Sequence, residues 1–224
     1  MQQPIAIDIF SDVICPWCRI GWERLKVALS APGAPVAAIR WLPFELNPDM
    51  PREGMDRSAY LSAKFGGPQG AARVYERVRE AARGDGVEFA FERIERTPST
   101  FDAHRLVWLG QCHGLGIQVK EALFDRYFSR GDDIGERAVL LDVAVVAGLD
   151  RAESEAMLDG TRGAEEVRGF EQAAQRLGIT GVPFFVVDRR LGVSGAQPPE
   201  VLAEVLVRAR SEAVGGTGQG DPAS

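Results

Sequence analysis

Two cysteines three residues apart, at the junction between a strand and a helix, constrain this chain more than any other feature. The segment Cys15-Pro16-Trp17-Cys18 follows Ile5 to Phe10, whose alternating isoleucines predict a buried strand. Pro16 suits the first position of a helix, because the N–H that proline lacks would be unpaired there. A second apolar run, Val36 to Phe44, predicts another strand. The pattern therefore indicates a strand–helix–strand unit with a right-handed crossover in a parallel sheet.

The spacing of the two cysteines predicts redox chemistry. Residues three apart on a helix are neighbours, so the two sulfurs can form a disulfide with little distortion. Cys15 lies at the helix N-terminus, where unpaired N–H groups favour an anion, so we expect a lowered thiol pKa; known motifs span roughly 3.5 to 7. We expect the Cys15 thiolate to attack a substrate disulfide and the more buried Cys18 to resolve the mixed disulfide. In reverse, the pair donates its disulfide to a dithiol.

Two other interpretations of the cysteine pair remain open. The pair could be half of a zinc site, which usually needs four ligands, but the other candidates are only Cys112, His104 and His113. Cys112 and His113 are adjacent on a predicted helix and point about 100° apart, so we predict no metal. The pair could also be inert and buried, as free cysteines often are. For Cys112 itself, a buried structural thiol is the expectation.

The middle of the chain is almost wholly helical in its pattern. Ser99 with Asp102 resembles a capping box. Gly114, Gly148 and Gly178 follow helical patterns, where helix C-caps favour glycine. The predicted helices cover residues 57–64, 69–83, 99–113, 117–129, 135–147, 151–158 and 163–177.

Strands return near the end of the chain. Val182 to Val187, a turn at residues 188–190 and Leu191 to Ser194 predict a hairpin, and a last helix is predicted from Pro199. The Gly-rich end, residues 213–224, is predicted to be a disordered tail.

Composition narrows the partners and the compartment. A net charge of -6 argues against a nucleic-acid or anionic-membrane surface, because both require a basic face. The sequence begins without a basic and apolar leader, and no run approaches the roughly 20 apolar residues that span a bilayer. We therefore expect a cytoplasmic protein, and disulfides in that compartment are usually transient and catalytic.

The order of elements and several motifs resemble the thioredoxin fold of the DsbA family, in particular its FrnE-like branch of dithiol–disulfide isomerases. Kappa-class glutathione transferases and 2-hydroxychromene-2-carboxylate isomerases are related to that branch. The resemblance covers Ile5 to Leu206 and is carried by FSDVICPWC at 10–18, PFELNP at 43–48, AHRL at 103–106, GVPFF at 181–185 and SGAQ at 194–197. It implies an α/β thioredoxin-like fold (βαβ…ββα) with a large inserted all-helical domain. Residues 1–50 and 180–212 would form the thioredoxin-like domain and residues 51–179 the insertion.

The resemblance also implies roles for individual residues. Cys15, Pro16, Trp17 and Cys18 would be catalytic together with Pro183, whose peptide bond would be cis and lie beside Cys15; from the residue alone, trans is expected. The backbone of Val182 would pair with an extended thiol substrate. Further candidates for substrate binding are Asp12, His104, Phe44 and Asn47.

Asp8 is a candidate proton acceptor for Cys18. The family often places an acid in the first strand, and Asp8 lies one residue further from the motif than in close DsbA relatives. The alternative is an exposed or merely satisfied carboxylate. A second departure is Pro98-Ser99-Thr100, where relatives commonly have Pro-Asn-Thr; Ser99 loses the amide but is as good an N-cap.

These observations favour a thiol–disulfide oxidoreductase or isomerase acting on a protein or a small molecule. It would need no cofactor beyond its own disulfide, with glutathione a candidate substrate or reductant. The first rival is a glutathione-dependent transferase or isomerase of the kappa-class type. Such enzymes carry Ser at the nucleophile position and an Asp-Arg pair near 195–197, so Cys18 and Gly195-Ala196-Gln197 argue against it.

The second rival is a non-catalytic polypeptide-binding module, with a groove lined by Trp108, Tyr60 or Phe65. The substrate, the direction of electron flow and the choice between monomer and homodimer stay open.

Overall fold

The computed structural model describes residues 4–215 and contains a four-stranded sheet in the order β2-β1-β5-β6. β1 pairs in parallel with β2 and antiparallel with β5, and β5 pairs antiparallel with β6. The predicted parallel unit and the predicted hairpin are therefore both present. The strands are β1 (Ile5–Ser11), β2 (Ala37–Pro43), β5 (Phe184–Val187) and β6 (Leu191–Ser194).

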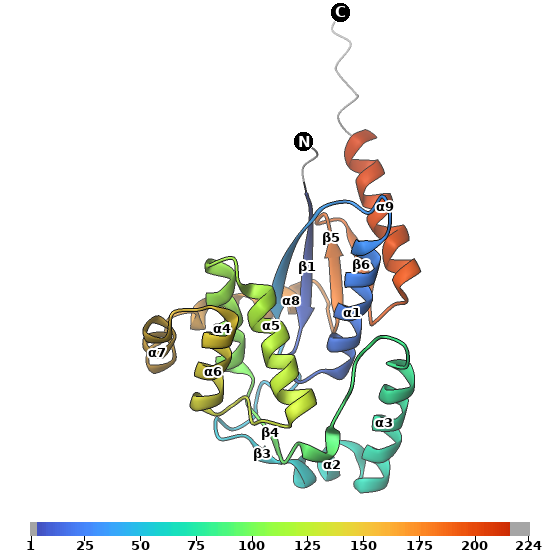
Figure 1. Cartoon of the computed structure of the whole chain (residues 1–224). Helices are drawn as coiled ribbons and strands as arrows, with labels where there is room; N and C mark the ends of the chain where they lie inside the picture. The colour runs from blue at the N-terminus through green and yellow to red at the C-terminus, as the bar shows by residue number, and fades with distance from the viewer. Residues whose placement is uncertain (1–3, 216–224) are drawn as a thin grey trace, which may run out of the picture.

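Helices cover both faces of this sheet (Figure 1). α1 (Pro16–Ser30) and α9 (Pro199–Gly215) pack together on one face, and α8 (Ala164–Arg176) lies against β2 on the other. Side chains alternate along a strand, so Ile7 and Ile9 of β1 join the large core that contains α1, whereas Phe10 joins a smaller core with Leu42 and α8.

The segment between β2 and β5 is mostly helical, as predicted. It contains α2 (Arg57–Phe65), α3 (Pro68–Ala81), α4 (Phe101–Cys112), α5 (Gly116–Phe124), α6 (Arg137–Ala147) and α7 (Arg151–Asp159), besides α8. It also contains a 3₁₀ turn, η1 (Phe91–Arg93), and a small sheet of β3 (Met55–Asp56) and β4 (Arg96–Thr97). The predicted helix 117–129 changes after Phe124 into a π-helical turn, η2 (Asp125–Arg130).

Three local expectations are wrong. α4 begins at Phe101 with Thr100 as N-cap and no side-chain cap, so Ser99 and Asp102 form no capping box. The Asp102 carboxylate instead accepts a hydrogen bond from Arg105 at 2.6 Å, one turn further along. Cys112 is exposed rather than buried, because it is the last residue of α4. Residues 213–215 belong to α9 rather than to a tail, and residues 216–224 lie outside the described part.

The helical insertion and the sheet share one core. A single cluster of buried side chains includes Ile9 and Trp22 together with Leu106 and Phe124 of the insertion. Within residues 4–215, no helix is long and apolar enough to cross a bilayer.

Candidate active site

The cysteine pair lies at the N-terminus of α1, as predicted. Cys15 is the N-cap residue and Pro16 the first helical residue, and the Cys18 N–H donates to the Cys15 carbonyl at 3.0 Å. Both thiols are free and buried, with 4% of Cys15 and 1% of Cys18 exposed, whereas Trp17 is 38% exposed. Trp17 is thus the one exposed residue of the motif, and both sulfurs lie below the surface.

The GVPFF segment brings Val182 and Pro183 to Cys15. The Cys15 thiol donates to the Val182 carbonyl, with 3.6 Å between sulfur and oxygen. The Val182–Pro183 peptide bond is cis, as the family resemblance implies and contrary to the expectation from the residue alone. Residues 167 positions apart thus form one side of the site.

A buried pair, Asp12 and His104, lies beneath the motif. Asp12 is fully buried and His104 is 3% exposed. His104 Nε2 lies 3.3 Å from Asp12 Oδ1, and the Leu46 N–H donates to Asp12 Oδ2 at 2.7 Å. Burial alone would raise the pKa of Asp12, but the imidazole, this N–H and the charge of Lys120 hold it below its usual value. Asp12 is therefore a buried carboxylate that favours its charged form, and its charge acts on Cys15.

Lys120 completes this buried layer, and the sequence analysis missed it. It belongs to α5 and is 1% exposed, with Nζ 3.5 Å from the Ser11 carbonyl oxygen. Burial lowers the pKa of Lys120 to about 8, whereas the charges of Cys18 and Asp12 act in the opposite direction. The signal was present in the sequence: Lys120, Leu123, Phe124 and Tyr127 follow a helical spacing of three, four and seven, which places a lysine in an apolar stripe.

The charge distribution of the reduced pair differs from the prediction. The hydrogen bond with the Cys18 sulfur and burial raise the pKa of Cys15 well above its usual value. Burial alone would also raise the pKa of Cys18, but the hydrogen bond with Cys15, the charge of Lys120 and the Ser11 hydroxyl lower it. The expected low pKa at Cys15 is therefore wrong for the resting pair, because both thiols are buried and the charge of Lys120 lowers the pKa of Cys18 instead.

Asp8 is not brought to Cys18. Both of its carboxylate oxygens accept hydrogen bonds from Arg40 on β2, at 2.8 and 2.6 Å. Asp8 lies two residues from Phe10, on the face of β1 that packs against α8, whereas α1 covers the Ile7 and Ile9 face. The one-residue offset noted in the sequence places this acid on the opposite face of the sheet.

The other candidates lie around the site without joining it. Phe44 packs against the smaller core of Phe10 and Leu42. The Asn47 side chain accepts hydrogen bonds from Tyr60 and Lys64 of α2, at 3.2 and 3.1 Å. Trp108, which was expected to share a groove with Tyr60 or Phe65, lines hollows beside α8 that neither of them reaches.

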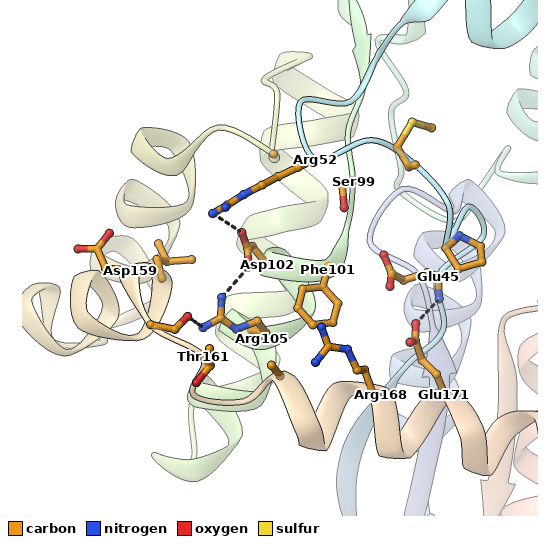
Figure 2. Close-up of a pocket in the computed structure, with 16 residues that line it drawn as sticks. Glu45, Arg52, Ser99, Phe101, Asp102, Arg105, Asp159, Thr161, Arg168 and Glu171 are labelled. Atoms are coloured by element: carbon orange, nitrogen blue, oxygen red, sulfur yellow. Dashed lines mark hydrogen bonds and ion pairs between the residues drawn. The ribbon is translucent and has the colours of Figure 1, made fainter.

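A cleft of about 700 Å³ opens beside this centre (Figure 2). Its walls are the segment after β2, the start of α4 and the connection from α7 to α8, and neither Cys15 nor Cys18 lines it. Glu45 and Glu171 meet at one end, where Glu171 Oε1 accepts from the Glu45 N–H at 3.3 Å. Burial and the charges of Glu171 and Asp12 raise the pKa of Glu45 to about 8.

A thioredoxin-like sheet, a cysteine pair opening its first helix and a cis-proline segment against the first sulfur define an oxidoreductase that exchanges thiols and disulfides. The chain belongs to the DSBA-like thioredoxin domain family, whose model matches residues 6–207. It is similar to a probable DsbA oxidoreductase from Streptomyces coelicolor, at 35% identity and a TM-score of 0.83, covering 93% of this chain and 91% of that one.

Two more distant structures share the fold. One is the cytosolic disulfide reductase DsbM from Pseudomonas aeruginosa with GSH, at 21% identity and a TM-score of 0.66, covering 92% of this chain and 99% of that one. The other is a 2-hydroxychromene-2-carboxylate isomerase, at 15% identity and a TM-score of 0.66, covering 93% and 98%. At these identities the likeness to both structures concerns the fold.

Proposed function

We propose that this protein is a dithiol–disulfide oxidoreductase or isomerase in which Cys15 attacks and Cys18 resolves. The observation that carries the proposal is the difference between the two sulfurs: Cys15 contacts the Val182 carbonyl next to the exposed Trp17, whereas Cys18 is 1% exposed and its pKa is lowered by the charge of Lys120. Extended substrate backbone can pair with Val182 while its disulfide meets the first sulfur.

The reaction runs in two exchanges. The Cys15 thiolate attacks one sulfur of a substrate disulfide, forms a mixed disulfide and releases the other sulfur as a thiolate. The Cys18 thiolate then attacks Cys15, so the Cys15–Cys18 disulfide forms and the substrate leaves as a dithiol. Two electrons pass from the protein to the substrate. Cys18 gives up the proton of the pair before it attacks, and this proton and one from solvent neutralise the two released thiolates.

The electrostatics support a proton transfer before the first exchange. The pKa of Cys15 is raised and that of Cys18 is lowered, so Cys18 is the sulfur that holds a negative charge more readily. If the Cys15 S–H turned from the Val182 carbonyl toward Cys18, transfer of its proton to Cys18 would activate the nucleophile without bulk water. The resolving cysteine would thus act first as a base.

We propose glutathione as the reductant that restores the dithiol, in the cytoplasm. The similar fold of the cytosolic reductase DsbM with GSH supports this choice. Cys18 supports the redox reaction over a glutathione-dependent isomerisation, because only disulfide exchange uses a second thiol.

The test is a count of free thiols across a titration with reduced and oxidised glutathione. The wild type should show one two-electron transition with a midpoint between about -120 and -270 mV. Cys15→Ser should abolish this transition, and Cys18→Ser should instead accumulate a stable mixed disulfide with glutathione. Activity that survives Cys15→Ser, or a wild type without the transition, would overturn the proposal.

A further inference from the structure

We propose that Lys120, supplied by the helical insertion, is a positioning residue that holds the negative charge of the reduced cysteine pair and thereby sets its reduction potential. This inference rests on the proposed function and deepens it. It gives the insertion a part in the redox chemistry besides forming the surroundings of the site.

The ammonium group of Lys120 is enclosed by the elements around the motif. Its Nζ lies 3.5 Å from the carbonyl oxygen of Ser11, the last residue of β1. It lies 5.1 Å from the ring centroid of Trp41 on β2 and 5.0 Å from that of Phe124 on α5. An aromatic face attracts a cation but adds no negative charge, so these contacts only partly replace water.

Within the described residues, no carboxylate lies within ion-pair distance of Lys120. A buried ammonium without a close counter-charge is costly. The negative charges that act on it are those of Asp12 and Cys15, in the connection from β1 to α1, and of Cys18, in the first turn of α1. Asp12 also has a partner of its own, because His104 Nε2 from α4 lies 3.3 Å from its carboxylate. The anion that changes during the reaction is therefore the Cys18 thiolate.

The consequence follows from the charges in the two redox states. In the reduced protein the Cys18 thiolate and Asp12 both compensate Lys120. When the Cys15–Cys18 disulfide forms, the thiolate charge is lost and the buried ammonium retains only Asp12. Lys120 therefore stabilises the reduced form relative to the disulfide and makes the protein a stronger oxidant. The helix N-terminus favours the same charge on the other sulfur.

The experiment compares Lys120→Met with Lys26→Met in the glutathione titration. Methionine has a similar length without the charge. Lys26 is a matched control because it is a lysine of α1 that contacts α5, through an ion pair with Glu121 at 2.8 Å, and it is far more exposed than Lys120. We expect Lys120→Met to favour the disulfide at least tenfold, a shift of about 30 mV to more negative potential. Lys26→Met should change the equilibrium constant with glutathione by less than about twofold, because exposed ion pairs are weak.

A second readout follows the ultraviolet absorbance of the thiolate against pH. In Lys120→Met the first thiolate should form at higher pH than in the wild type, and Lys120→Arg should restore most of the difference. An unchanged potential and an unchanged absorbance profile in a folded Lys120→Met would overturn the inference. So would an equal shift in Lys26→Met.

The wild type provides a test that does not depend on the variants folding. The titration of the Lys120 ammonium, followed by NMR, should occur at lower pH in the oxidised than in the reduced protein. Equal titrations would overturn the inference. If the wild type shows a two-electron transition while Lys120 fails these tests, only this inference falls; if no transition exists, the proposed function falls with it.

Discussion

The carboxyl group of Glu45 experiences three unfavourable effects at once. It is half-buried, it meets Glu171 at the end of the cleft, and Asp12 adds a second negative charge nearby. The Thr100 hydroxyl, at 3.5 Å, offers the only favourable contact among the causes of its shifted pKa, which is about 8. The folded protein therefore binds the Glu45 proton more tightly than the unfolded chain does.

This proton makes stability depend on pH with a definite sign. The pKa of Glu45 is about 8 in the folded state and about 4.3 in an unfolded chain. The Glu45 proton therefore contributes fully to the free energy of unfolding below the unfolded-state pKa, and this contribution is lost as pH rises through the folded-state pKa. Glu45→Gln mimics the neutral acid. We expect its free energy of unfolding, relative to that of the wild type, to rise by about 1–2 kcal/mol between pH 5 and 9. Solvent reaches part of the Glu45 carboxyl group, so the gain stays well below the full linkage value.

Urea unfolding of both proteins across this approximate pH range checks the prediction. Glu165→Gln, at an exposed position of α8, is the control. Its free energy of unfolding plotted against pH should run parallel to that of the wild type. Parallel curves for Glu45→Gln as well would show that Glu45 titrates normally.

Residue types and spacing were sufficient to find the sulfurs but not their electrostatics. The CPWC spacing identified Cys15 and Cys18, and the GVPFF segment identified Pro183. Which sulfur holds the charge depends on Lys120, more than 100 residues away in sequence and buried by tertiary packing. Likewise Asp8 and Asp12 are both acids before the motif, and only the alternation along β1 separates their environments.

At the scale of elements, α1 is positioned against the proline segment by a glycine. A Cβ atom on Gly21 would lie 2.9 Å from Pro183 Cγ, 3.2 Å from Phe185 Cζ and 3.6 Å from Ala196 Cα. The absent side chain lets the helix that carries both cysteines approach β5 and the loop before it. Glycine normally destabilises a helix interior. At this position that cost is accepted because a larger side chain would keep α1 away from Pro183 and Phe185.

A pair of substitutions separates these two effects. Gly21→Ala should destabilise the protein by about 1–3 kcal/mol, because the added methyl group overpacks the contact with Pro183. Gly169→Ala, inside α8 with nothing within 4 Å of the new Cβ, should stabilise it by about 0.5–1 kcal/mol. Thermal and urea unfolding check both values. Equal effects at the two glycines would contradict the close approach of α1.

Elements long enough to show a hydrophobic periodicity were predictable from the sequence. The two-residue strands and the π-helical turn were not. The sheet strands and the hairpin Leu191 to Ser194 have clear patterns, and the glycines at 114, 148 and 178 all adopt positive φ. β3 and β4 are two residues each, too short to show a period. The π-helical turn η2 has the same apolar spacing as an α-helix over one turn, so its sequence indicated α-helix to Ser129.

At the scale of the whole molecule, the helical insertion closes an edge of the sheet. β2 is an edge strand, and the Gln111 side chain of α4 pairs with it: the Trp41 N–H donates to Gln111 Oε1 at 2.7 Å, and Gln111 Nε2 donates to the Trp41 carbonyl at 3.1 Å. A second contact joins the insertion to α1, where the Trp22 indole N–H donates to Glu121 of α5 at 2.8 Å. An edge strand otherwise exposes unpaired backbone groups.

These contacts predict that the two predicted domains unfold together. Gln111→Leu keeps an apolar side chain of similar size but leaves both Trp41 backbone groups without partners, which should cost about 1–3 kcal/mol. Because the core is continuous from Trp22 to Phe124, tryptophan fluorescence and far-ultraviolet circular dichroism should give coincident unfolding curves for the wild type and for Gln111→Leu. Gln118→Leu, on the exposed side of α5, should leave the midpoint unchanged. Two separate transitions would mean that Lys120 sits on an independently folding unit, and then the charge beneath the cysteines could be withdrawn without unfolding the sheet.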